Sequence, residues 1–497
     1  MFRSSVFALL LTVLHAVSSA AEKPNFIVLI ADDISYDDIG CYGSLNGRTP
    51  HLDSLAKEGL KFTNAILTAS SCSPSRCSIL TGRYPHNNGE AAELHRPIAW
   101  HIPSVSGMLR DAGYYAALAG KNHMTWSDAP EGEKAPTQAF DKIYGTKVPG
   151  NSGGHGNWIK AIDECPEEKP FFLWLAALDA HRAWDGDGEW DESKFGPKHN
   201  PDTVILPPAL LDRPETRTDF ASYLNEVTRF DWYVGEVVRH LKENGTFSNT
   251  QIFVIADNGR PFPRAKTRLH DDGMKTYFIT TGPAVKKTGE TSSSLISVID
   301  IAPTVCEMAG IENTPTLQGR SLLPVLQNPT EQIRPYAFSE HNWHDYEALG
   351  RSVRDGKYLY IINDRTESAW QGPADSVKSA SFQDLLSANR SAELLTPLQQ
   401  DIFQAPRPKT ELYDTSGDPH QIDNLSGNAT YESVEKRLAE ALSFWRKETG
   451  DSSPDEISKD FFDRETGDRL KMLRKDYQRP PPGADRKADR SNADGLE

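Results

Sequence analysis

Four apolar segments of this chain each end in a short group of polar residues, and this pattern restricts the fold more than any other feature. The segments cover residues 25–30, 114–119, 171–178 and 250–256, and their composition is typical of buried strands. Acids, amides, lysines or histidines follow each of them. Because the carboxyl ends of parallel strands meet at one edge of an open sheet, we expect one shared polar site at that edge.

The segments between these strands predict an α/β fold with a large, mostly parallel sheet flanked by helices. The clearest helix is expected over residues 216–242, where apolar side chains recur at helical spacing before Asn244 and Gly245. From about residue 335 the pattern changes to short strands over 336–339, 350–362 and 411–414, followed by a helix over 432–447. This change predicts a smaller α+β subdomain with a small antiparallel sheet.

The expected organisation is a signal peptide (1–20), a catalytic domain (21–335), a C-terminal subdomain (336–460) and a loose polar tail (461–497). Arg3, an apolar run over 6–17 and the small residues 18–20 indicate the signal peptide. The apolar run is too short to favour a membrane anchor, and no later segment is expected to span a membrane. We therefore expect an exported protein, periplasmic or secreted in a bacterium, lysosomal or secreted in a eukaryote.

Charge and cysteine content narrow the possible partners. The net charge of −16 comes from 70 acidic and 54 basic residues, and no basic stripe indicates a nucleic-acid partner. An anionic substrate would need local basic residues, and a divalent cation would account for part of the acidic excess. Five cysteines are too few for a disulfide scaffold, and their odd number leaves at least one outside an intramolecular pair. The sequence does not define the oligomeric state.

The segment 71–83, Ser-Cys-Ser-Pro-Ser-Arg-Cys-Ser-Ile-Leu-Thr-Gly-Arg, contains the strongest candidate nucleophile. Pro74 predicts the beginning of a helix and Gly82 its end. Cys72 is then expected at a helix N-terminus, where anions bind, with Arg76 in the first turn. On spacing alone, however, the favoured interpretation is a capped helix with a buried cysteine.

The pattern Cys72-x-Pro74-x-Arg76, followed by Leu-Thr-Gly-Arg at 80–83, resembles the signature of the type I sulfatases. The resemblance implies an alkaline-phosphatase-like fold and oxidation of Cys72 to formylglycine by a formylglycine-generating enzyme. A hydrated aldehyde offers two hydroxyls on one carbon, one to attack sulfur and one to expel the sulfate afterwards. A serine or a thiolate has no equivalent route to release the product.

The same resemblance implies roles for the residues at the strand ends. One Ca²⁺ per chain would be bound by Asp32, Asp33, Asp257, Asn258 and the oxygen derived from Cys72, although Asp32 and Asp33 alone would be better explained as a turn or cap. Sulfate would be bound by Arg76, Lys121 and Lys266. His123 would take a proton as sulfate leaves, and His181 would protonate the leaving group, although Ala180 replaces the usual preceding proline.

Segments 71–76, 257–263, 381–386 and 411–414 are most similar to the N-sulfoglucosamine sulfohydrolase branch of that family. This implies a sulfated carbohydrate substrate carrying an N-sulfate or an O-sulfate. We expect sugar contacts from Asp179, His341 and His344, and Asn342 and Trp343 either join them or pack a subdomain interface. The alternatives are an exo-O-sulfatase acting on an algal or other polysaccharide, a phosphomonoester or phosphonate hydrolase of the same fold, and a catalytically inactive protein that binds sulfated glycan.

Overall fold

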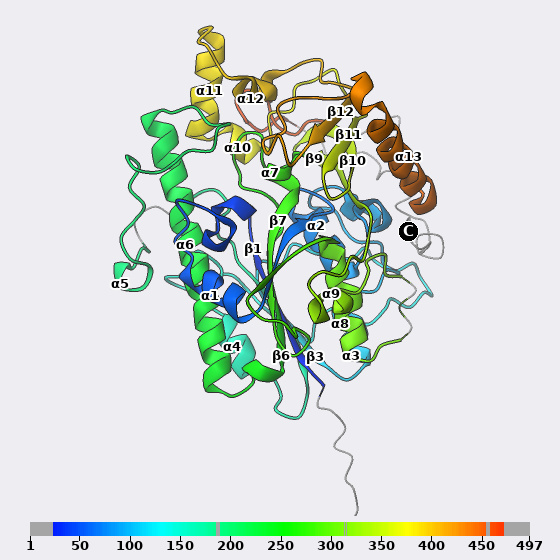
Figure 1. Cartoon of the computed structure of the whole chain (residues 1–497). Coiled ribbons are helices and arrows are strands. Elements are labelled where there is room, and N and C mark those ends of the chain that lie inside the picture. The colour runs from blue at the N-terminus through cyan, green and yellow to red at the C-terminus, as the bar shows by residue number, and fades with distance from the viewer. Residues whose placement is uncertain (1–22, 185–188, 313, 315, 454–457, 472–497) are drawn as a thin grey trace, which may run out of the picture.

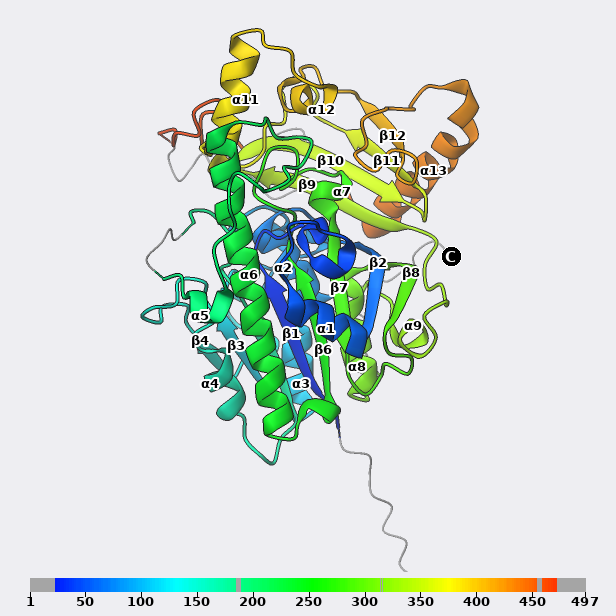
Figure 2. The same ribbon diagram turned by 60° about the vertical axis from the view of Figure 1, so that its left-hand side comes forward.

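The computed structural model describes residues 23–184, 189–312, 314, 316–453 and 458–471, so the predicted signal peptide lies outside the described residues. These residues form two sheets, and the smaller one lies over the carboxyl edge of the larger (Figures 1 and 2). The fold is therefore the predicted α/β arrangement with a second antiparallel sheet.

The larger sheet has eight strands in the order β4-β3-β5-β1-β6-β7-β2-β8. Only β7 runs antiparallel to its neighbours, and β1 lies at the centre between β5 and β6. The strands are β1 (Asn25–Ala31), β2 (Leu60–Ile66), β3 (Tyr115–Gly120), β4 (Lys142–Tyr144), β5 (Phe171–Ala176), β6 (Thr250–Ala256), β7 (Lys275–Thr281) and β8 (Glu290–Ser297).

Helices cover both faces of this sheet, which explains why its central strands are continuously apolar. Alternate side chains of β1 belong to two different cores: Val28 packs with the face covered by α2, α3 and α8, and Leu29 with the face covered by α1, α4 and α6. These helices are α1 (Pro50–Glu58), α2 (Cys72–Thr81), α3 (Val105–Asp111), α4 (Trp158–Asp163), α6 (Pro214–Glu243) and α8 (Ile301–Met308). The predicted long helix is thus α6.

The smaller sheet has the order β12-β11-β10-β9 and is antiparallel throughout. Its strands are β9 (Ala337–His344), β10 (Tyr346–Arg354), β11 (Tyr358–Asn363) and β12 (Thr410–Asp414). The prediction of one strand over 350–362 is wrong, because Asp355 and Gly356 turn the chain between β10 and β11. The N–H groups of Lys357 and Tyr358 donate to Asp355 Oδ1 in this turn.

The remaining helices complete the edges of the two layers. They are α5 (Glu192–Phe195), α7 (Asp271–Met274), α9 (Leu323–Gln327), α10 (Ala374–Val377), α11 (Ala380–Arg390), α12 (Pro397–Gln400) and α13 (Glu432–Thr449). α13 packs through Leu438, Leu442 and Trp445 on the smaller sheet. Within the described residues, no helix combines the length and the apolar character needed to cross a bilayer.

Part of the predicted loose tail, 461–471, packs on the protein together with residues 458–460, and the rest, 472–497, lies outside the described residues. The ring of Phe461 lies 4.7 Å from that of Trp343, and Trp343 donates its indole N–H to the carbonyl of Lys459. Ser458 is buried and donates to Glu93. These contacts hold this part of the chain against β9 and the loop after α2.

Candidate active site

The carboxyl ends of β1 and β6 bring four oxygen-bearing side chains together, as the sequence predicts. Asp32 and Asp33 follow β1, and Asp257 and Asn258 follow the neighbouring strand β6. The amide N–H of Asp33 donates to Asp257 Oδ1 at 3.1 Å, and Asn258 Nδ2 donates to Asp33 Oδ1 at 2.5 Å. All four residues are buried.

Cys72 begins helix α2, so the helix starts two residues earlier than Pro74 predicts, and this proline lies within the first turn. The thiol Sγ lies 3.8 Å from Asp33 Oδ1, and only 1% of the residue is exposed. Arg76, one turn later, donates Nε to Asp257 Oδ2 at 2.7 Å, and its Nη2 lies 3.5 Å from Asp32 Oδ1. The helix thus presents the candidate nucleophile and a guanidinium to the same carboxylates.

Two lysines complete a balanced cluster of three acids and three cations. Lys121 follows β3 and donates to Asp32, and Lys266 donates to Asp33 Oδ2 at 2.7 Å. Burial alone would lower the pKa of each lysine, but the adjacent carboxylates raise both pKa values above the usual one. Both ammonium groups therefore stay charged beside the cysteine.

The two carboxyls nearest Arg76 differ in their acidity. Burial raises the pKa of Asp257 to about 7, although Arg76 opposes this effect. Burial also acts against ionisation of Asp32, but Lys121 and Arg76 hold its pKa well below the usual range. At neutral pH, Asp257 is therefore the more basic of the two.

The same cluster fits a hard divalent cation. Asp32 Oδ1 and Asn258 Oδ1 are buried, yet neither accepts a hydrogen bond from any residue that the structure describes. Oxygen atoms of Asp32 and Asp257 lie within 4.8 Å of each other and of the Cys72 sulfur. A set of carboxylate and amide oxygens is the kind that Ca²⁺ or Mg²⁺ binds in proteins.

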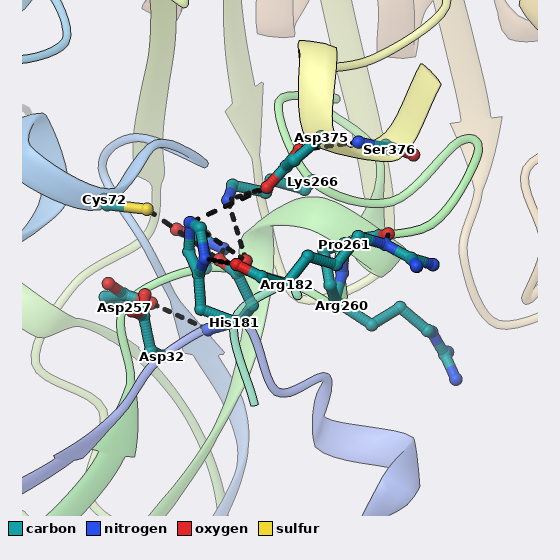
Figure 3. Close-up of polar contacts among 12 residues, drawn as sticks. Asp32, Cys72, His181, Arg182, Asp257, Arg260, Pro261, Lys266, Asp375 and Ser376 are labelled. Carbon is teal, nitrogen blue, oxygen red and sulfur yellow. Dashed lines mark hydrogen bonds and ion pairs between the residues drawn. The ribbon is translucent and has the colours of Figure 1, made fainter. Parts of the chain in front are cut away.

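His181 faces this cluster from the end of β5 (Figure 3). Its Nδ1 bonds to the carbonyl of Arg182, and its Nε2 lies 4.0 Å from Asp33 Oδ2. The side chain is 33% exposed, so a ligand can reach it. Because Nδ1 is turned to a carbonyl, Nε2 is the atom free to exchange a proton with a ligand.

His123 lies beside a second histidine, His95, which the sequence did not indicate. Nδ1 of His95 and Nε2 of His123 are 2.5 Å apart, and the amide of His95 donates to Ser73 Oγ at 2.8 Å. Burial, together with Lys121 and His95, lowers the pKa of His123 far below the usual value. His123 is therefore neutral at neutral pH, and its surroundings in this structure disfavour protonation.

Asp179, which the sequence predicts to contact the sugar, is paired within the protein. Its carboxylate receives two hydrogen bonds from Arg229 on α6, at 2.6 and 2.8 Å, and is 1% exposed. Its carbonyl accepts the N–H of Asp32 at 2.8 Å. Asp179 thus positions the end of β1, and its carboxylate is held by Arg229.

Of the residues on β9 that the sequence suggests as sugar contacts, only His344 lies close to the cluster. Its Nδ1 lies 2.7 Å from Ser71 Oγ, next to Cys72. His341 instead packs its ring 5.0 Å from that of Trp370, and Trp343 packs on Phe461. For Asn342 and Trp343, the packing interpretation is the one that the contacts favour.

Asp375 is a second residue that sequence reasoning missed. It lies on α10, and its Oδ2 is 3.3 Å from Lys266 Nζ and 3.6 Å from His181 Nε2 (Figure 3). A helix of one turn has no measurable periodicity, and the segment 372–375 is more than 100 residues from Lys266 in the chain. Only the folded structure could reveal the contact.

Comparison with known proteins gives the same family over most of the chain. The family model described as Sulfatase matches residues 24–311, and the model described as N-sulphoglucosamine sulphohydrolase, C-terminal, matches residues 264–405. Human N-sulphoglucosamine sulphohydrolase is 29% identical over 87% of this chain and 91% of its own length. An ulvan-active sulfatase of Formosa agariphila is 28% identical over 87% of this chain and 76% of its own length.

Solved structures share the fold. One, described as a complex with its substrate D-glucosamine-2-N,6-O-disulfate, gives a TM-score of 0.63 at 20% identity and covers 88% of this chain and 100% of its own. A phosphonate monoester hydrolase of Agrobacterium radiobacter gives 0.65 at 17% identity, over 85% of this chain and 95% of its own. Proteins with this fold therefore catalyse more than one reaction, whereas both family models that match this chain describe sulfate-cleaving enzymes. The chain belongs to the sulfatase family, and it is a hydrolase of sulfuric esters or sulfamates.

Proposed function

We propose that this protein removes sulfate from a sulfated carbohydrate, using a formylglycine made from Cys72 and one bound Ca²⁺. The observation that carries the proposal is the position of Cys72. It lies at the N-terminus of α2, 3.8 Å from Asp33, in a buried cluster with Arg76, Lys121 and Lys266. This is an arrangement for holding an anion against a nucleophile.

Asp32, Asp33, Asp257 and Asn258 would hold the cation together with the oxygen derived from Cys72. When bound, Ca²⁺ would offset the three carboxylates and polarise the sulfuryl oxygens. The two buried oxygens without a hydrogen bond, on Asp32 and Asn258, support this assignment. The chain itself holds these four side chains in place, because they follow β1 and β6, which are adjacent and parallel.

Arg76, Lys121 and Lys266 would bind the sulfuryl oxygens. Arg76 is fully buried and its direction is fixed by Asp257, so it needs little reorganisation when the substrate arrives. Both lysines carry charge at neutral pH because carboxylates raise their pKa values. Three fixed cations stabilise the charge that shifts onto oxygen as the sulfuryl group transfers.

Proton transfer would be divided among three residues. A formylglycine supplies a hydroxyl nucleophile and a second hydroxyl for product release. Asp257, whose pKa burial raises to about 7, would accept the proton of the nucleophile. His181 would donate from Nε2 to the leaving atom, because its Nδ1 is held by the Arg182 carbonyl. His123 would take a proton when sulfate departs, a role that rests on the resemblance to the family's second signature around Lys121 and His123.

The substrate is proposed to be a sulfated sugar, with N-sulfate and O-sulfate both compatible with the relatives. One relative is a sulphohydrolase of N-sulphoglucosamine and another is active on ulvan.

We also propose that the protein is exported, periplasmic or secreted in a bacterium and lysosomal or secreted in a eukaryote, as residues 1–20 predict. A formylglycine-generating enzyme would be its partner during maturation.

The test is sulfate release from defined sulfated disaccharides that carry one N-sulfate or one O-sulfate each, with 4-nitrophenyl sulfate and 4-nitrophenyl phosphate assayed in parallel. We expect turnover of at least one sulfated sugar and faster cleavage of the aryl sulfate than of the aryl phosphate. Faster cleavage of the phosphate would favour the phosphatase alternative. Tight binding of sulfated glycan with no turnover by protein carrying the modification would favour the inactive binding protein.

A further inference from the structure

Asp375 is a carboxylate of the C-terminal subdomain that lies beside the proposed leaving-group acid. Its Oδ2 atom is 3.6 Å from Nε2 of His181, and α10 carries it over the cluster from the second layer of the fold (Figure 3). The side chain is 24% exposed, so it borders space that a ligand can enter. An acceptor group therefore lies next to the atom that would meet the leaving group.

The position of this carboxylate is set by its own helix. Its Oδ1 accepts the N–H of Ser376 at 2.7 Å, and the N–H of Ala374 donates to Asp345 Oδ2 at 3.1 Å. Val377, two residues later, is completely buried. Backbone contacts thus fix the position of the Asp375 carboxylate independently of its contact with Lys266.

Asp375 is ionised, and it is not needed to neutralise Lys266. Burial opposes its ionisation, but Lys266, His181 and Arg182 lower the pKa of Asp375 below its usual value. Lys266 already has a closer partner in Asp33, at 2.7 Å against 3.3 Å. At neutral pH, Asp375 can only accept hydrogen bonds.

A carboxylate at this place distinguishes the two bonds that a sulfatase can break. In a sulfamate the bridging nitrogen carries a hydrogen, whereas in a sulfate ester the bridging oxygen presents only lone pairs. A leaving atom that meets His181 Nε2 lies close to Asp375, which attracts an N–H and repels lone pairs. The charge of Asp375 therefore favours one substrate class.

We propose that Asp375 is a specificity-determining residue that favours N-sulfated over O-sulfated sugars by accepting a hydrogen bond from the sulfamate N–H. The inference rests on the proposed sulfatase function and refines its substrate class. The competing explanation is that Asp375 only orients His181. That role would affect both substrate classes alike, because both need a proton on the leaving atom.

The experiment compares two sugars that differ only at the bridging atom, glucosamine 2-N-sulfate and glucose 2-O-sulfate. We expect the wild-type protein to have the higher kcat/KM on the N-sulfate. Asp375→Asn keeps the size of the side chain and removes its charge, and it should lower the ratio of the two kcat/KM values by about 10- to 100-fold, the worth of a charged hydrogen bond. The matched control is Glu347→Gln, which alters a carboxylate on β10 that pairs with Arg365 at 2.9 Å. The control should keep the wild-type ratio.

Each result has one meaning. An equal loss on both sugars in Asp375→Asn, or a wild-type preference for the O-sulfate, overturns the role of Asp375 and leaves the sulfatase function standing. If wild-type protein with modified Cys72 releases sulfate from no substrate, 4-nitrophenyl sulfate included, the proposed function itself fails. A selective loss on the N-sulfate, with an unchanged melting temperature, supports the inference.

Discussion

Arg76 donates its Nε hydrogen to Oδ2 of Asp257 over 2.7 Å, and neither side chain has any exposed surface. The pair joins the first turn and a half of α2 to the end of β6, which lie 181 residues apart in the chain. The same contact therefore contributes to stability and directs the guanidinium toward the proposed sulfate position.

Arg76→Met should lower the free energy of unfolding by about 3–5 kcal/mol, because it leaves carboxylates buried without their cation. Urea denaturation followed by circular dichroism measures the change. Arg239→Met is the control, since Arg239 pairs with Glu236 and Glu243 on the exposed face of α6, and it should cost less than about 1 kcal/mol. Similar losses in the two variants would contradict this account of the buried pair.

Protein that retains the Cys72 thiol should be inactive. Burial raises the pKa of this thiol well above its usual value, so the thiolate is scarce at neutral pH. Mass spectrometry of active protein should show the peptide around residue 72 in a form lighter than the thiol. Cys72→Ala should abolish turnover, whereas Cys165→Ser, a change at a cysteine outside the cluster, should not. Fully active protein with only the thiol form would refute the proposed nucleophile.

Ca²⁺ should raise the melting temperature of the protein, and a chelator should abolish turnover. A ligand at 100 times its Kd stabilises the folded state by about 2.7 kcal/mol, and here it would also relieve the repulsion among three buried carboxylates. Asp257→Ala should remove both the thermal shift and the activity. Asp231→Asn, at a buried acid that accepts the N–H groups of His51 and Leu52, should keep the shift. Undiminished activity without metal would exclude the site.

His181→Ala should lose far more activity on a sulfated sugar than on an aryl sulfate. A sugar hydroxyl or amine leaves poorly without a proton, whereas nitrophenolate leaves readily. The difference between the two losses should approach the roughly 10²–10⁴-fold worth of a general acid. Steady-state kinetics on both substrates provides the measurement. Equal losses would mean that His181 only positions the sulfate.

The segment after α13 should be required for a stable site. Phe461 packs in one apolar cluster with Cys72, Leu94 and Trp343. Phe461→Ala should cost about 3–5 kcal/mol, as deletion of a buried ring does. The matched control is Leu470→Ala, because Leu470 is 41% exposed, and it should be nearly neutral. Thermal or urea unfolding compares the two, and equal effects would show that the packing of Phe461 contributes little.

The sequence predicts those residues of the site that the strand topology alone brings together. Asp32, Lys121, His181 and Asp257 each follow an apolar strand, and parallel pairing must bring such strand ends to one edge. The contribution of the second layer is not predictable in this way. Asp375 reaches His181 from a one-turn helix, and the carboxylate of Asp179 pairs with Arg229, a contact that no local pattern identifies. Strand β7 reverses direction within the sheet, which periodicity cannot detect.

Under the proposed modification of Cys72, its burial also sets an order of events in the biogenesis of this protein. In the folded chain the residue has 1% of its surface exposed, and the carboxylates, lysines and Phe461 that enclose it come from segments between residues 32 and 461. An oxidising enzyme can reach the cysteine only while these segments are still apart. Slower folding would thus lengthen the interval for maturation, and a chain that folds first would remain permanently as a stable but inert by-product.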